Sequence, residues 1–498
     1  MLRRDFFHLA MFSGLIPLAM RQTAKKPAAS SFPHVKGLTR YVVEFISKTD
    51  YNSIPSDVIQ DGKKDMLDGF GLALAGSAAT TGHLSRKYID SLCPCPSSGQ
   101  ATVAGTAMKA NPRFATFLNG ISIHAFDFDD TQLALGKDRV YGLLMHPTVT
   151  ALAPAFALAE AEGKSGKDLM LAYQLGVEVA CKIAQAISPR SYEDGFHTTG
   201  VCGPFGATAA GLKLLGLDLD QSLNAFGVAG AEGSGLTVNF GTMTKPFHAG
   251  HAGESGIVAV DLAALGWTAA HDILEAPGGF FHAYGGSYDP GYILNKLGNP
   301  WTFANPGVSI KPFPCGSLTH PGMDEMLRLI RQNNITPGEV ESVDVGTNRH
   351  SYDTLIRHDP QTGLEAKFSM EFCMAILLLE RKAGLTEFTD AVVRRPDVQA
   401  MIRRVHYSVS PVAEAAGFNK MTTIIHIHLK DGRTISGRAD FAKGSPQYPM
   451  SYDEVADKFR GNADFAHWPK DKTEKIIETV SKLESVADVR ELTPLLSA

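Results

Sequence analysis

The chain has 498 residues, of which 44% are hydrophobic and 20% are charged, and its formal net charge is -5 at pH 7. This composition is typical of a globular protein with two or three domains, and the dispersed lysines and arginines exclude the clustered basic face that nucleic-acid binding needs. The six cysteines are too scattered for a disulfide framework, and no segment has the apolar length of a membrane-spanning helix.

The N-terminus resembles a twin-arginine export signal. Arg3 and Arg4 precede aromatic residues and a modest apolar run from Leu9 to Ala19. The alternative is a frayed N-terminal helix with two chance arginines. The lack of a clean small-x-small cleavage site after the apolar run weakens the prediction of export. We assign residues 1–34 to the signal and a polar linker, and we expect a periplasmic protein, with a cytoplasmic one as the alternative.

Helical periodicity dominates the chain from about residue 35 to residue 299, where Ala and Leu are frequent and Gly and Pro punctuate the segments. Thr148–Ala161 is apolar on nearly all sides, which is typical of a central buried helix. The pattern predicts helices over Ser56–Ala75, Pro147–Glu162, Lys167–Ile187 and Gly206–Leu215.

The pattern becomes mixed near Trp301 and turns helical again after about residue 444. Asp431-Gly432 is a strong hairpin signal after a strand-like run. Strands are predicted over 340–345, 405–409 and 425–429, and helices over 323–331 and 368–381. We therefore predict a mainly α protein in which an α+β domain, residues 303–442, is inserted between two helical parts, residues 35–302 and 443–498.

Three predicted helix starts place a potentially cationic side chain before a proline: His146-Pro147, Lys245-Pro246 and His320-Pro321. Proline favours the first helical position and holds the preceding residue in an extended conformation. That residue then lies beside free backbone N–H groups and the positive end of the helix dipole. Three such sites together would suit a substrate with several carboxylates, although each one alone is better explained as a helix boundary.

The segment Asp127-Phe128-Asp129-Asp130-Thr131 follows His124 and gathers carboxylates. Neighbouring carboxylates raise one another's proton affinity, which suits acid–base chemistry, although an isolated motif of this kind is more often a loop or a helix cap. Haloacid-dehalogenase phosphatases share this sequence motif but also need a later Gly-Asp motif, which the chain lacks. Class II terpene cyclases need an aromatic-rich pocket, and the chain has only three Trp.

Two further histidine groups have both structural and functional explanations. His197 lies among small residues before a Gly/Ala-rich segment and could line a cleft or be satisfied structurally. His248, His251 and Glu254 have the spacing of one helical face, but such residues are more often solvated or packed, and the His-Glu-x-x-His motif is absent. We predict no metal, and no phosphate-loop or dinucleotide fingerprint predicts a cofactor.

Taken together, these segments resemble the MmgE/PrpD family, which includes 2-methylcitrate dehydratases and cis-aconitate decarboxylases. The short matches cover nearly the whole chain after the linker and occur in the family's order. They are His124–Thr131, His146–Thr148, Gly195–Thr199, Thr244–Gly250, Lys311–Cys315 with Thr319–Pro321, Glu365–Ser369, and Gly444–Pro446 with Pro449–Ser451.

The resemblance implies a large all-helical domain built from both chain ends, a smaller α+β lid and a site in the cleft between them. It also implies a homodimer without an iron–sulfur cluster. The family's site residues correspond to Asp127, Thr131, His146, His197, Lys245 and Lys311. The chain departs from the family at Gly316-Ser317, at Phe372, and in a longer segment, residues 132–145, that carries Lys137, Arg139 and Tyr141.

We therefore expect a cofactor-independent lyase, a dehydratase or decarboxylase, that moves a proton next to a carboxylate of a small di- or tricarboxylate. The charge that develops there must be held by preorganised cations, a role for Lys245 and Lys311. Asp127 and His146 are the candidates for proton transfer, in an order left open, and His197 for the leaving group. Further substrate contacts are predicted at Thr131, Cys315 and His320. The alternatives are an epimerase or isomerase of the same family, or a non-catalytic periplasmic carboxylate-binding protein.

Overall fold

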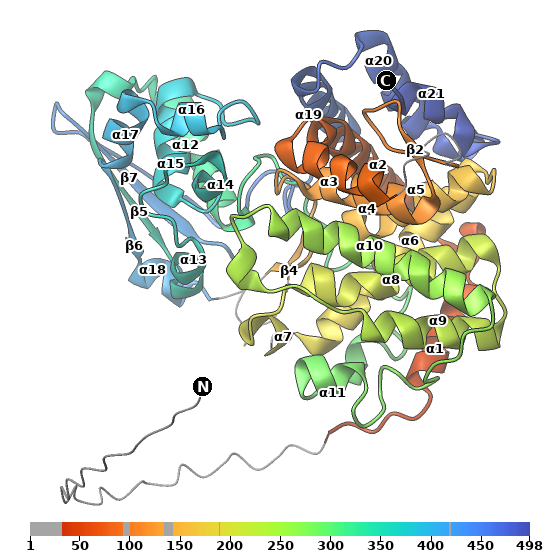
Figure 1. The fold of residues 1–498 in the computed structure, drawn as a ribbon. Helices are drawn as coiled ribbons and strands as arrows, with labels where there is room; N and C mark the ends of the chain where they lie inside the picture. Colours follow the sequence, from red (N-terminus) through yellow and green to blue (C-terminus); the bar gives the residue numbers. More distant parts are fainter. Residues whose placement is uncertain (1–31, 93–99, 134–142, 189, 418–419) are drawn as a thin grey trace, which may run out of the picture. The chain divides into compact units, whose positions relative to one another are not determined.

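The computed structural model describes residues 32–92, 100–133, 143–188, 190–417 and 420–498. The predicted export signal and Lys137, Arg139 and Tyr141 lie outside these residues. The described part is mainly α-helical with small sheets, as predicted (Figure 1). Pro33–Ala498 pack as one unit, so the boundaries that we placed at residues 302 and 442 stay predictions.

The segment that precedes the mixed region is a set of packed helices with two short hairpins. Its helices are α1 (Leu38–Lys48), α2 (Ser56–Ser77), α3 (Thr80–Leu92), α4 (Pro112–His124), α5 (Pro147–Ala161), α6 (Gly166–Ile187), α7 (Arg190–Glu193), α8 (Thr198–Leu215), α9 (Leu219–Ala231), α10 (Thr244–Ala264) and α11 (Phe280–Gly285). Its hairpins pair β1 (Ala101–Thr102) with β2 (Lys109–Ala110), and β3 (Gln132–Leu133) with β4 (Leu143–Met145).

Helix α5 is the central buried helix that the sequence predicts, because every residue from Pro147 to Glu160 is buried. Helix α8 packs closely between α6 and α10. A Cβ on Gly206 of α8 would lie 2.7 Å from the carbonyl oxygen of Gly176 on α6, so the two backbones can approach only because both residues are glycine. This packing fixes the N-terminal ends of α5, α8 and α10, from which His146, His197 and Lys245 project.

The middle segment contains a four-stranded sheet in the order β6-β5-β7-β8, and it carries the predicted strands. The strands are β5 (Val340–Thr347), β6 (Val405–Val409), β7 (Thr423–Leu429) and β8 (Thr434–Ala439). Strand β5 pairs in parallel with β6, with Val343 opposite Val405, and antiparallel with β7, with Val343 opposite Ile427. Gly432 has a φ of 89°, which supports the predicted turn between β7 and β8.

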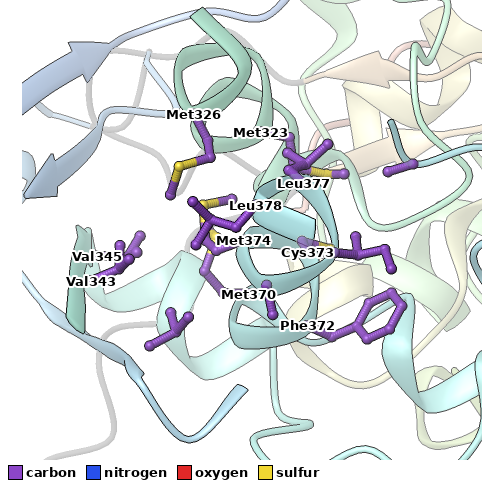
Figure 2. Close-up of a cluster of buried hydrophobic side chains, with 14 of the residues drawn as sticks. Met323, Met326, Val343, Val345, Met370, Phe372, Cys373, Met374, Leu377 and Leu378 are labelled. Atoms are coloured by element: carbon purple, nitrogen blue, oxygen red, sulfur yellow. The ribbon is translucent and has the colours of Figure 1, made fainter. Parts of the chain in front are cut away.

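Helices α12 (His320–Asn333) and α15 (Met370–Glu380) accompany this sheet. Buried side chains of both helices and of β5 form one core cluster, in which Met326, Met374 and Val343 are each 0% exposed (Figure 2). Phe372, a departure from the family pattern, lies in this core, where its ring centroid is 5.1 Å from that of Phe388. The segment's shorter helices are α13 (Arg349–Thr354), α14 (Gly363–Ala366), α16 (Asp390–Val393), α17 (Pro396–Ile402) and α18 (Pro411–Ala415).

The C-terminal segment returns to the first helices of the chain. It holds α19 (Tyr452–Phe465), α20 (Lys470–Ser481) and α21 (Thr493–Leu496), and Figure 1 shows α19 beside α2. Lys458 of α19 donates a hydrogen bond of 2.8 Å to Asp68 of α2. Within the described residues, no helix combines the length and the apolar character that crossing a membrane requires.

Candidate active site

Asp127 lies in the turn after α4 and is the anchor of a buried charge cluster. Its φ of 52° is uncommon for a residue with a side chain. Its Oδ1 accepts hydrogen bonds from Lys245 Nζ at 2.5 Å and from Lys311 Nζ at 2.9 Å, and Lys311 also donates to the Asp127 carbonyl oxygen at 2.8 Å. The three side chains are buried. Two cations and one anion therefore share the cluster and leave a net positive charge.

His146 lies beside this cluster at the start of α5. Its φ of -96° and ψ of 97° give the extended conformation that we predicted before Pro147. Its Nε2 lies 3.5 Å from Asp127 Oδ1 and 3.4 Å from Lys245 Nζ, and its Nδ1 lies 3.4 Å from Asp129 Oδ2. A proton on Nδ1, facing Asp129, leaves the Nε2 lone pair directed at Lys245.

His124 and His197 complete a group of buried imidazoles around His146. His124 Nδ1 lies 2.8 Å from Asp129 Oδ1, and its ring centroid is 4.4 Å from that of His146. His197 begins α8, and its Nδ1 lies 3.1 Å from His248 Nδ1. One of these two rings must donate and the other accept, which requires at least one of them to be neutral.

The pKa values of these groups follow from burial and from their neighbours. Burial alone would raise the pKa of Asp127, but the charges of Lys245 and Lys311 outweigh it and hold that pKa well below its usual value. Burial lowers the pKa of His146 to about 3, although Asp129 opposes the shift. Burial also lowers the pKa of Lys245, against the attraction of Asp127. At neutral pH, Asp127 is therefore a carboxylate and His146 a neutral base.

A pocket opens over this cluster. Its charged floor is Asp127, Lys245 and Lys311. Apolar side chains form a second wall: Phe240, Leu318, Leu355 and Phe368. Neutral polar side chains also line it: Tyr192, Ser317, His350 and Thr354. Residues of the first helical segment and of the middle segment thus face one another across the same space.

Three of the predicted substrate contacts lie away from the residues that line this pocket. Thr131 is 0% exposed, and its backbone pairs with Ser309. Cys315 Sγ lies 3.1 Å from Thr319 Oγ1, and His320 Nε2 lies 3.2 Å from the Cys315 carbonyl oxygen. Gly316 and Ser317, which follow Cys315, line the pocket. A direct role for Thr131, Cys315 and His320 stays a prediction.

The extended conformation that we expected before each proline is wrong at two of the three positions. Lys245 already lies within the first turn of α10, and its N–H donates to the Thr242 carbonyl at 3.2 Å. His320 is helical, with φ of -61° and ψ of -43°, because the 3-10 turn of Ser317–Thr319 leads directly into α12. The steric effect of proline on its neighbour is a bias, and a turn that already runs into the helix overrides it.

Two lysines of the site were not predicted from the sequence. Lys367 Nζ donates to the carbonyl oxygens of Phe126 at 2.6 Å and of Pro314 at 2.7 Å. Lys458 Nζ donates to the Phe128 carbonyl oxygen at 2.8 Å as well as to Asp68. Both lysines therefore hold the backbone on either side of Asp127. Lys367 lies in one of the family-like segments, which was the only sequence signal for it.

Among the described residues, two groups of side chains have ligand atoms close enough together for a metal ion. They are His124, His146 and His197, and His124, Asp127, Asp129 and His146, each with ligand atoms within 4.8 Å of one another. In the second group two ammonium groups already occupy Asp127. His248, His251 and Glu254 do not meet at one point. His251 Nδ1 lies 3.4 Å from Glu254 Oε2, and Glu254 also pairs with Arg113 at 2.8 Å, but His248 faces His197.

Comparison with known families matches both halves of the chain. The model of the MmgE/PrpD N-terminal domain matches residues 40–293, and that of the C-terminal domain matches residues 313–485. The chain belongs to the MmgE/PrpD family. This confirms the resemblance that the motifs around Asp127, His146 and Lys245 indicated.

Curated members of this family resemble the chain over nearly its whole length. Human cis-aconitate decarboxylase is 28% identical over 474 residues, which cover 93% of this chain and 95% of that protein. The mouse enzyme of the same name is 28% identical over 475 residues, covering 93% of this chain and 94% of that protein. Cis-aconitate decarboxylase of Aspergillus terreus strain NIH 2624 / FGSC A1156 is 26% identical over 490 residues, covering 93% and 96%.

Proposed function

We propose that this protein is a lyase that removes carbon dioxide from a small unsaturated di- or tricarboxylate. Its family membership and its similarity to cis-aconitate decarboxylases over 93% of the chain support the reaction class. The observation that carries the mechanism is the buried pair of lysines around Asp127, beside the neutral imidazole of His146. Fixed cations at the floor of a largely apolar pocket stabilise developing negative charge more strongly than they would in water.

In the proposed reaction, substrate carboxylates bind Lys245 and Lys311. The bond between the departing carboxylate and its neighbouring carbon breaks, carbon dioxide leaves, and the electron pair stays on that carbon. Conjugation spreads the pair toward a remaining carboxylate, which Lys311 holds. Lys245 Nζ then donates a proton to the carbon, forms the new C–H bond, and recovers a proton from solvent.

Asp127 and His146 have different roles in this scheme. Because two ammonium groups keep the pKa of Asp127 well below its usual value, Asp127 serves as the anchor of the lysines. His146 Nε2, 3.4 Å from Lys245 Nζ, is the neutral partner that orients the ammonium group. In a dehydration the same nitrogen would act as the base, so this arrangement also supports the dehydratase reaction as a second candidate.

Proton NMR in D₂O with a panel of carbon-13-labelled di- and tricarboxylates tests the proposal. Decarboxylation releases labelled carbon dioxide and leaves one deuterium on the carbon that lost it. Dehydration releases water and keeps every carbon. Epimerisation exchanges one proton of the substrate for deuterium and releases neither water nor carbon dioxide. Binding without exchange would contradict the enzyme proposal and favour a carboxylate-binding protein.

We further propose that the protein is exported to the periplasm by the twin-arginine route, because Arg3 and Arg4 precede an apolar run. Replacement of both arginines by lysine should retain the protein in the cytoplasm of its native host, as fractionation would show. A wild-type protein that fractionates with the cytoplasm would contradict export. The homodimer stays a prediction, which light scattering of the purified protein tests.

A further inference from the structure

Apolar side chains line the pocket beside its charged floor, and Lys245 Nζ lies 5.1 Å from the centroid of the Phe240 ring. The rings of Phe240 and Phe368 are stacked, with centroids 6.1 Å apart and planes at 20°. Phe368 and Leu318 are each 8% exposed and Leu355 is 0% exposed, and all three line the pocket beside Phe240. A substrate bound to the lysines therefore has an apolar surface within reach of the part that points away from them.

The pocket offers few charges to a highly charged substrate. Among the described residues that line it, Lys245 and Lys311 are the fixed cations, and they share Asp127. Burial lowers the pKa of His350, so this imidazole is neutral near pH 7. Lys367 is occupied by two backbone carbonyl oxygens and lies outside the lining. Two carboxylates can each meet an ammonium group, but a third would face the phenylalanine wall without a counter-charge.

We propose that the preferred substrate is a dicarboxylate with an uncharged apolar substituent, whose two carboxylates meet Lys245 and Lys311 while the substituent packs on Phe240 and Phe368. This inference rests on the proposed lyase function and names its substrate class. The apolar group gains contact with the wall, whereas a carboxylate in its place would be desolvated and unpaired.

Gly316 is the position where the charge of this wall can be changed. It lines the pocket, and its φ of -58° and ψ of 129° are accessible to any residue. A Cβ there would have its nearest neighbours at ordinary contact distances: 3.4 Å from the Lys367 carbonyl oxygen, 3.5 Å from Leu355 Cδ2 and 3.6 Å from Phe368 Cδ1. Gly316→Arg should thus place a guanidinium group beside the apolar wall without straining the backbone.

The test compares a matched pair of unsaturated substrates. One is a tricarboxylate that carries one of its carboxylates on a carboxymethyl group. The other is the dicarboxylate in which an ethyl group replaces that carboxymethyl group. For the wild-type protein we expect kcat/KM to favour the ethyl compound by about tenfold to a hundredfold, the discrimination typical of an unpaired polar group. Gly316→Arg should reverse the preference, and the uncharged control Gly316→Gln should not.

The outcomes separate this inference from the proposed function. A wild-type preference for the tricarboxylate would overturn the substrate class and leave the lyase function standing. If neither compound is turned over, the lyase proposal fails, and calorimetric affinities for the same pair then decide the substrate class alone. Should Gly316→Arg fail to fold by circular dichroism, Phe240→Ala serves instead. It should reduce kcat/KM for the ethyl compound more than for its unsubstituted parent, and equal reductions would contradict the proposed packing.

Discussion

Lys245 Nζ lies 2.5 Å from Asp127 Oδ1, although the two residues are 118 positions apart in the chain. The same oxygen also accepts from Lys311 at 2.9 Å. A buried carboxylate between two ammonium groups is stabilised as an anion and is a poor proton acceptor. The proposed mechanism therefore assigns the mobile proton to Lys245 and gives Asp127 the role of positioning it.

Lys245→Ala should lower turnover about a hundredfold or more, which corresponds to the roughly 3 kcal/mol that one preorganised charge donor supplies at a transition state. Asp127 keeps its bond to Lys311 in this variant, so we expect the fold to remain. Lys245→Arg should rescue poorly, because a planar guanidinium does not fit a point-charge site. Steady-state kinetics on a confirmed substrate measures both.

Lys182→Ala is the matched control for this loss. Lys182 is also buried and paired, with Glu178 at 3.8 Å, but it lies outside the pocket lining. It should lower the melting temperature and keep turnover. Near-normal turnover of Lys245→Ala would contradict the role of the lysines as an anion clamp, and the family relationship would then speak for the fold alone.

Asp127→Asn should shift the pH dependence of kcat as well as lower it. Asp127 opposes the lowering of the Lys245 pKa that burial causes, so without its charge the ammonium group loses its proton at a lower pH. If protonated Lys245 is the acid, the alkaline limb of kcat moves to lower pH. A pH–rate profile from about pH 6 to pH 9.5 measures the shift.

The control for this profile is Glu178→Gln, which removes the buried acid that accepts from the N–H groups of Gly298 at 2.8 Å and Thr302 at 2.7 Å. This variant should be less stable but keep the wild-type alkaline limb. An unchanged limb in Asp127→Asn would show that Lys245 is not the titrating acid.

The sequence predicted the elements and motifs whose signals are local. The apolar run after Pro147 predicted the buried helix α5, and the alternating residues of 340–345 predicted β5. The motif residues Asp127, His146 and Lys245 meet within one cluster, as their place in the family pattern suggested. These features could be predicted because hydrophobic periodicity, turn chemistry and sequence motifs are all short-range properties of the chain.

The remaining parts of the site depend on contacts between distant segments. Lys367 and Lys458 bind backbone carbonyl oxygens of Phe126 and Phe128. Every residue offers such an acceptor, so no sequence pattern marks these contacts, and only the family-like segment around Lys367 drew attention to that lysine. Phe240 and Phe368 form one wall although they are distant in the chain. The helices α10 and α12 include Lys245 and His320 in their first turns, although a residue before proline prefers an extended conformation.

Removal of divalent metals by a chelator should leave turnover unchanged. His124, His146 and His197 have ligand atoms within 4.8 Å of one another, but the nearby ammonium groups of Lys245 and Lys311 repel a cation and already occupy Asp127. Elemental analysis of the purified protein together with kinetics after chelation checks this. A loss of activity that one specific divalent ion restores would make the three imidazoles the centre of the mechanism.

His146 should make the protein sensitive to acid, and the sign of this effect follows from its pKa. The folded protein holds the pKa of His146 at about 3, below the value of about 6.5 for an unfolded chain. Between these values the unfolded state binds a proton that the folded state excludes, so stability is present above pH 6.5 and falls as the pH falls. Such a group contributes up to about 1.4 kcal/mol per pH unit. Buried acids with raised pKa values, such as Asp68 at about 6, have the opposite effect, so the whole-protein curve alone does not isolate His146.

The comparison of wild type with His146→Gln isolates this contribution, because the two proteins share nearly all other groups. The variant should have a lower free energy of unfolding than wild type at pH 7.5. This difference should shrink by about 1.4 kcal/mol for each pH unit below 6.5. Urea unfolding at several pH values measures this difference. If the difference in unfolding free energy between wild type and His146→Gln stays constant with pH, His146 takes up its proton as readily in the folded protein as in the unfolded chain. Its assignment as a neutral base beside Asp127 would then be wrong.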